Sequence, residues 1–202
     1  MSTQGILYSF RRCPYAMRTR FALYSAKINH EHREVQLKNK PMELLTLNPK
    51  GTVPVFHLSN GDVLKESMDI IFYALSSPQL SKMESELIEE NDTTFKSSLD
   101  RYKYPTKYGQ DHIEHRDICE AFLVKLENNL TLHKDGDMSL IEMALFPFVR
   151  QFANVDLDWF NTRPYPKLRE WLQSVESSEL YQQIMKKYST WTTTSDPVNI
   201  NF

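Results

Sequence analysis

The chain has 202 residues, of which 41% are hydrophobic and 25% charged, and its formal net charge is −2. This composition is that of an ordinary globular chain with one large domain or two small ones, and it excludes a disordered or collagen-like chain. The longest apolar runs, such as residues 70–75, are far shorter than the roughly 20 residues of a membrane helix. We therefore expect no membrane span, and the slightly acidic balance does not favour a nucleic-acid partner.

Charge is distributed unevenly along the sequence. Residues 1–80 contain 10 Lys and Arg against 6 Asp and Glu, whereas residues 81–202 contain 14 against 20. Two solvated surfaces of different sign explain this pattern, and so do two domains of which the first attracts a small anion.

The first 75 residues alternate between strand and helix patterns. Strands are predicted at 6–10, 32–37, 53–58 and 63–65, and helices at 14–27, 41–48 and from Ser67 onward. The first strand–helix–strand unit predicts a parallel pair, and the turn at 60–62 predicts an antiparallel hairpin. The sequence thus predicts a mixed four-stranded sheet with helices.

Residues 76–81 resemble a linker, and only helices are predicted after it. One helix spans about 87–102 and stops near Pro105, and others cover 118–130, 168–175 and 180–185. Ser139 and Glu142 form a capping box before a further helix, which contains Pro147. The tail at 192–202 shows no clear periodicity. We predict two domains, residues 1–78 and an all-helical domain at 82–202.

Cys13 is the strongest candidate for chemistry. It stands just before Pro14, which suits the first position of a helix. Free N–H groups and the helix dipole stabilise a thiolate there and lower the pKa of the thiol, and Arg11 and Arg12 add positive potential. The alternative is a small buried residue that precedes a proline.

The chain has two cysteines, which are too few for a disulfide scaffold and indicate a reducing compartment. No basic region followed by an apolar core opens the sequence, so we expect no signal peptide and a cytoplasmic protein. Ala16 stands where a dithiol oxidoreductase has its second cysteine, so Cys13 needs an external thiol for turnover. Cys119 is predicted to be a core residue.

Two further signals accompany Cys13. Pro54 begins a buried strand, where a cis Val53–Pro54 bond would turn the Val53 backbone toward an extended ligand. Ser67 at a helix N-cap would leave N–H groups free for a ligand carboxylate, and Glu66 could accept a bond from a ligand ammonium. The alternative at this position is an ordinary cap beside a surface acid.

In this order and spacing, these segments resemble the glutathione transferase family over nearly the whole chain. The resemblance rests on residues 13–16, 50–55, 66–67 and the capping box at Ser139, and Cys-Pro-Tyr-Ala is similar to the omega-type, cysteine-dependent branch. It implies a thioredoxin-like amino-terminal domain, an all-helical second domain, a homodimer and glutathione as co-substrate.

The resemblance also implies a role for each site residue. Cys13 would form a mixed disulfide with glutathione, and Lys40 would pair with the glycyl carboxylate. Val53, next to cis-Pro54, would pair with the cysteinyl unit, and Glu66 and Ser67 would hold the γ-glutamyl group. The second substrate would sit between the domains, where the candidate walls are Tyr15, Tyr102, Tyr104, Tyr108 and Trp171. We expect no metal, because His112 and His115 have no further ligand pattern.

The function that follows from this resemblance is a glutathione-dependent thiol transferase with a monothiol mechanism at Cys13. Its substrates would be glutathione mixed disulfides or glutathionyl adducts, and dehydroascorbate by the same logic. One alternative is a transferase that conjugates glutathione to electrophiles, with Tyr8 or Ser9 supplying the activating hydroxyl. Another is an interaction module without catalysis, because fold does not imply function.

Overall fold

A computed structural model describes residues 3–108, 112–129, 131 and 138–202. The chain forms two compact units, of which one comprises the residues up to Pro78 together with Glu179–Phe202, and the other comprises Gln79–Ser178. The second predicted domain, 82–202, therefore differs from the second unit, because its last 24 residues pack with the first unit. No helix in the described part is long and apolar enough to cross a membrane.

The first unit is built on a mixed sheet with the strand order β4-β3-β1-β2-β5. Its strands are β1 (Gly5–Ser9), β2 (His30–Glu34), β3 (Val55–Leu58), β4 (Val63–Leu64) and β5 (Val198–Ile200). β1 and β2 are parallel, whereas the pairs β1–β3, β3–β4 and β2–β5 are antiparallel. The predicted mixed sheet and thioredoxin-like arrangement are confirmed, with a fifth strand in addition.

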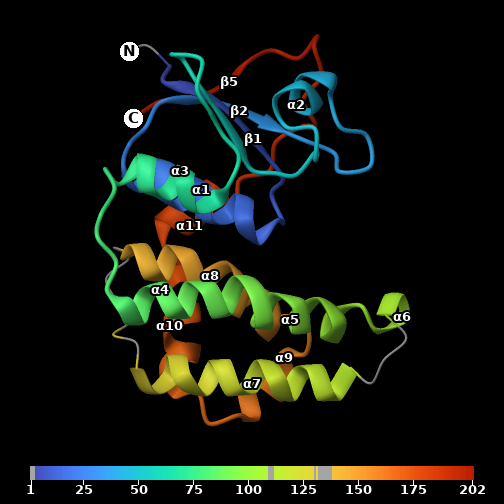
Figure 1. Cartoon of the computed structure of the whole chain (residues 1–202), viewed down its shortest axis with the longest axis vertical. Coiled ribbons are helices and arrows are strands. Elements are labelled where there is room, and N and C mark those ends of the chain that lie inside the picture. The colour runs from blue at the N-terminus through green and yellow to red at the C-terminus, as the bar shows by residue number, and fades with distance from the viewer. Residues whose placement is uncertain (1–2, 109–111, 130, 132–137) are drawn as a thin grey trace. The chain divides into compact units, whose positions relative to one another are not determined.

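Helices cover both faces of this sheet (Figure 1). They are α1 (Pro14–Ser25), α2 (Met42–Leu47), α3 (Ser67–Ala74) and α11 (Glu179–Ile184). α1 and α3 pack together on one face and α2 lies on the other. On the α2 face, Tyr8, Val55 and Leu44 form a buried cluster, against which Cys13 packs. Cys13 therefore packs against the core of this unit.

The fifth strand comes from the carboxyl-terminal tail, which showed no periodicity in the sequence. β5 pairs with β2, and Phe202 packs edge-on against Tyr24 with 5.1 Å between ring centroids. Upstream, the Trp191 N–H donates to the Glu34 carbonyl at 2.7 Å, and the Arg33 guanidinium lies 4.1 Å from the Trp191 ring centroid. The tail thus covers the edge strand of the sheet with backbone and aromatic contacts.

The second unit is helical in the described residues. Its helices are α4 (Lys82–Glu90), α5 (Lys96–Lys103), α6 (Pro105–Tyr108), α7 (His112–Asn129), α8 (Leu140–Ala153), α9 (Leu157–Thr162) and α10 (Pro166–Ser177). A π-helical segment, Asn91–Phe95, joins α4 to α5, where the sequence predicted one continuous helix. The prediction also missed the short helices α6 and α9, and the predicted end of a helix at residue 130 lies outside the described residues.

Two capping arrangements position helices of this unit. The predicted box at Ser139 is present, since the Ser139 hydroxyl accepts from the Glu142 N–H and the Glu142 carboxylate accepts from the Ser139 N–H at 2.9 Å. At α10, the buried carboxylate of Glu127 accepts from the N–H groups of Lys167 and Leu168, both at 2.9 Å. A side chain on α7 therefore supplies the acceptor that the first turn of α10 needs.

Candidate functional site around Cys13

Cys13 occupies the N-cap position of α1. Its φ of −74° and ψ of 123° are extended, and Pro14 begins the helix. The Cys13 N–H donates to the Phe10 carbonyl at 3.0 Å, and the Cys13 carbonyl accepts from Met17 at 2.9 Å. The half-buried thiol thus lies at the amino-terminal end of α1, where the helix dipole favours an anion.

A buried arginine holds the turn that leads into Cys13. Arg20 is 1% exposed, and its guanidinium donates to the Ser9 hydroxyl at 2.6 Å and to the Arg11 carbonyl at 2.6 Å. Burial lowers the pKa of Arg20 to about 10, while the negative charge of Glu34 opposes this shift. The guanidinium therefore remains charged at neutral pH beneath the turn.

The loop before β3 faces Cys13. The Val53–Pro54 peptide bond is cis, and the Cys13 thiol donates to the Val53 carbonyl at 3.7 Å. Proline begins the segment without an N–H, which leaves the adjoining backbone outside the ladder between β3 and β1. The backbone carbonyl of Val53 is therefore in direct contact with the thiol of Cys13.

Gly51 allows Lys40 to lie beside this loop. Gly51 has a φ of 64°, in the region that favours glycine. A Cβ atom at this position would lie 3.0 Å from Lys40 Cδ and 3.1 Å from Lys40 Nζ. A side chain at residue 51 would therefore both strain the backbone and displace the ammonium of Lys40.

The start of α3 differs from the prediction by one residue. Glu66 holds the N-cap position and Ser67 is the first helical residue, because the Glu66 carbonyl already accepts from the Ile70 N–H at 3.2 Å. No side chain caps this helix. Ser67 is buried and its hydroxyl accepts from Arg18 at 3.4 Å, whereas Glu66 is exposed. The first-turn N–H groups are thus not occupied by a side-chain cap.

These features meet in one pocket of the first unit. Its volume is about 430 Å³, and its lining residues are Cys13, Tyr15, Leu37, Lys40, Lys50, Gly51, Thr52, Val53, Pro54, Lys65, Glu66 and Ser67. All residues predicted to bind glutathione line this pocket together with Cys13. The sequence analysis gave no role to Lys50 or Lys65, although Lys50 begins the motif at 50–55 and Lys65 directly precedes the motif at 66–67.

The predicted walls for a second substrate are spread over both units. Tyr15 lines the pocket, whereas Tyr104 and Tyr108 are 45% and 37% exposed on the second unit. Trp171 is 1% exposed and packs edge-on against Phe146 with 5.4 Å between ring centroids. Trp171 is therefore a core residue, in contrast to the predicted role at a substrate surface, and Tyr102 is likewise 5% exposed.

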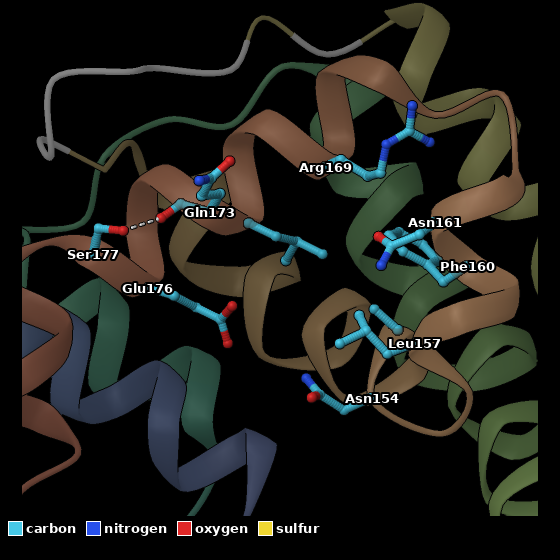
Figure 2. Close-up of a pocket in the computed structure, with 10 residues that line it drawn as sticks. Asn154, Leu157, Phe160, Asn161, Arg169, Gln173, Glu176 and Ser177 are labelled. Atoms are coloured by element: carbon cyan, nitrogen blue, oxygen red, sulfur yellow. Dashed lines mark hydrogen bonds between the residues drawn. The ribbon is translucent and has the colours of Figure 1, made fainter.

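A second cleft, of about 530 Å³, lies within the second unit (Figure 2). Its polar lining comes from the end of α8, from α9 and from α10, as residues Asn154, Asn161, Arg169, Gln173, Glu176 and Ser177. The Glu176 carboxylate accepts from Arg150 at 2.7 Å, and the Ser177 hydroxyl donates to the Gln173 carbonyl at 2.7 Å. No cysteine or histidine lines this cleft, so the pocket at Cys13 is the better candidate for chemistry.

Cys119 has a different environment. It is fully buried on α7, its thiol donates to the Phe95 carbonyl at 3.7 Å, and burial raises its pKa to about 12. Such a thiol is inert at neutral pH. Among the described residues, no group of three or more His, Cys, Asp or Glu side chains is arranged to hold a metal ion.

The first unit thus combines a thioredoxin-like sheet, a cysteine at the start of α1 and a proline before β3. Residues 12–76 match the family model described as "Glutathione S-transferase, N-terminal domain". "Glutathione S-transferase omega-1" of Mus musculus is 27% identical over 184 residues, which cover 84% of this chain and 75% of that protein.

Solved structures share the fold. Glutathione transferase Omega 3C from Trametes versicolor superposes with a TM-score of 0.69 at 18% identity, over 94% of this chain and 92% of that one. The transferase URE2P6 from Phanerochaete chrysosporium, solved with oxidized glutathione, gives 0.75 at 15% identity, over 91% and 95%. These solved structures have the same fold as this chain, and both the matching family model and the similar curated proteins are glutathione S-transferases.

Proposed function

We propose that this chain is a glutathione transferase of the thiol-transferase type, which works through Cys13 as its single reactive thiol. The named glutathione S-transferases among its relatives support transferase activity. The observation that carries the thiol-transferase assignment is the pocket in which Cys13 meets the residues expected to bind glutathione. The predicted cytoplasmic location and homodimer stay predictions.

Glutathione fits the charges and backbone groups of this pocket. Lys40 would pair with the glycyl carboxylate, and the Val53 backbone would pair with the cysteinyl unit beside Cys13. Glu66 would accept from the γ-glutamyl ammonium, and Ser67 with the start of α3 would bind its carboxylate. Two similar solved structures are described with bound glutathione and with oxidized glutathione, which supports glutathione as co-substrate.

The reaction would proceed by two thiol–disulfide exchanges. The Cys13 thiolate attacks the glutathione sulfur of a mixed disulfide, so that a Cys13–glutathione disulfide forms and the partner leaves as a thiolate. A second glutathione thiolate then attacks this disulfide, which releases glutathione disulfide and restores Cys13. Ala16 and the buried Cys119 offer no resolving thiol, so glutathione itself must fill that role.

The environment of Tyr8 and Ser9 argues against the conjugating alternative. Tyr8 is 2% exposed, its hydroxyl accepts from Arg33 at 2.7 Å, and its pKa is raised chiefly by burial although Arg33 opposes the shift. Ser9 is fully buried and its hydroxyl accepts from Arg20 at 2.6 Å. Neither hydroxyl is available at a surface to activate a glutathione thiol.

Mass spectrometry of the intact protein after exposure to glutathione disulfide tests the proposal. We expect one added glutathione, located at Cys13. The variant Cys13→Ala should form no adduct and should not reduce mixed disulfides. Cys119→Ala is the matched control and should keep both. Full activity in Cys13→Ala would refute the mechanism, and absence of glutathione binding by calorimetry would favour the non-catalytic interaction module.

A further inference from the structure

The pocket at Cys13 has more positive charge than glutathione requires. Three lysines line it, Lys40, Lys50 and Lys65, against one carboxylate, Glu66. Lys50 and Lys65 are exposed and Lys40 is half-buried. Within the described part of the chain, none of the three ammonium groups forms an ion pair with a carboxylate. Their charges therefore act on whatever occupies the pocket.

A count of charges with glutathione in place leaves an excess. In the proposed binding mode, Lys40 is matched by the glycyl carboxylate and Glu66 by the γ-glutamyl ammonium. The remaining α-carboxylate provides one negative charge against Lys50 and Lys65 together. Apart from the Cys13 thiolate, the loaded pocket thus keeps about one positive charge. The thiolate offsets this charge before the attack, and the departing RS⁻ experiences it once Cys13 has formed its disulfide.

We infer that Lys50 and Lys65 make the enzyme selective for mixed disulfides whose non-glutathione half has an acidic group close to the sulfur. This inference rests on the proposed function. The reaction is RS–SG + GSH → RSH + GSSG, in which R is anionic, and the thiolate RS⁻ leaves when Cys13 takes the glutathionyl group. Acidic small thiols and protein cysteines flanked by carboxylates belong to this substrate class.

The expected size of the effect follows from the dimensions of the pocket. A sphere with the volume of this pocket, about 430 Å³, has a diameter of about 9 Å. This distance is close to the Debye length of about 8 Å at physiological salt. At that separation in water and without salt screening, each pair of unit charges changes a rate or affinity about twofold. One net positive charge acting on R groups of opposite sign should therefore separate an anionic from a cationic substrate by about fourfold at low salt.

Three mixed disulfides of glutathione test this inference, because their R groups have nearly the same size and differ in charge. They are the mixed disulfides with 2-mercaptoethanesulfonate, 2-mercaptoethanol and cysteamine, which are anionic, neutral and cationic. The leaving thiols differ in intrinsic reactivity, so each kcat/KM is divided by the rate constant of the uncatalysed reaction with glutathione. The wild-type protein is compared with the double variant Lys50→Ser/Lys65→Ser.

Lys82→Ser/Lys187→Ser is the matched control, since it removes the same net charge at exposed residues outside the pocket. We expect wild type and control to prefer the sulfonate over the ammonium substrate by about fourfold at low salt. The pocket variant should lose or reverse this preference, because removal of two lysines leaves its loaded pocket net negative. The preference should also shrink at about 0.5 M salt.

Two results would overturn the inference while leaving the proposed function intact. One is Cys13-dependent turnover without a charge preference in the wild type. The other is an equal loss for all three substrates in the pocket variant, with a raised KM for glutathione, which would mean that the lysines hold glutathione itself. Absence of turnover with all three substrates would refute the proposed function and this inference together.

Discussion

Arg20 provides the most direct test of how the fold supports Cys13. Arg20→Met keeps a long apolar side chain but removes the guanidinium beneath the turn. The Ser9 hydroxyl and the Arg11 carbonyl, each 2.6 Å from the guanidinium, would lose their donor in the buried interior. The turn that fixes the Cys13 N–H on the Phe10 carbonyl would lose its support at the same time.

The magnitude follows from these contacts. Each hydrogen bond from a charged donor contributes about 1.5–3 kcal/mol, and removal of the buried charge recovers part of its desolvation cost. We therefore expect Arg20→Met to lower the free energy of unfolding by about 3 kcal/mol. At about 2–4 °C per kcal/mol for a chain of this size, Tm should fall by about 6–12 °C.

Thermal unfolding followed by circular dichroism measures this effect, and the rate of Cys13 alkylation by iodoacetamide reports on the turn. Arg12→Met is the matched control, because Arg12 is exposed on the same turn, and it should stay within about 0.5 kcal/mol of wild type. Arg20→Lys keeps the charge but not the two-pronged geometry and should fall in between. Equal Tm values for Arg20→Met and Arg12→Met would refute this reasoning.

Three further outcomes are expected. Glu127→Ala should cost about 2 kcal/mol in urea unfolding, since two N–H groups at the start of α10 lose a buried carboxylate, and unchanged stability would contradict that capping role. Burial lowers the pKa of His30 to about 4, so below about pH 6.5 the unfolded state binds a proton that the folded state does not. The free energy of unfolding should therefore fall by about 2 kcal/mol from pH 7 to 5, and by less in His30→Asn. Gly51→Ala should cost about 1–2 kcal/mol and raise the KM for glutathione, and unchanged kinetics would argue against Lys40 as a ligand.

The fold was largely predictable from local patterns in the first 75 residues. Pro14 after Cys13 predicted a helix start, and the hydrophobic runs predicted the four strands that make the sheet. β5 has three residues, too few for an alternation to emerge, and its pairing with β2 depends on contacts about 170 residues apart. The π-helical segment at Asn91–Phe95 has no distinctive sequence pattern, because its apolar spacing continues that of the flanking helices.

The candidate site was predictable where motifs are local and less so elsewhere. Cys13, Val53 and Ser67 stand in recognisable segments, although the cap of α3 is one residue earlier than predicted. Lys50 and Lys65 could not be assigned to the pocket, because the sequence does not distinguish a lysine that faces solvent from one that faces a ligand. Trp171 was predicted at a substrate surface but lies in the core, because helical spacing does not distinguish a core aromatic from one at a binding surface.

The assignment of Glu179–Phe202 to the first unit has a consequence for how the protein is made. On the ribosome, β1, β2 and β3 emerge early, but β2 keeps an open edge until synthesis reaches β5 near residue 200. The helical unit is nested inside the sequence of its neighbour and emerges entirely during that interval. A fragment cut at residue 78 would therefore expose an unprotected strand, and the sheet of the first unit is complete only after residues 198–200 have been made.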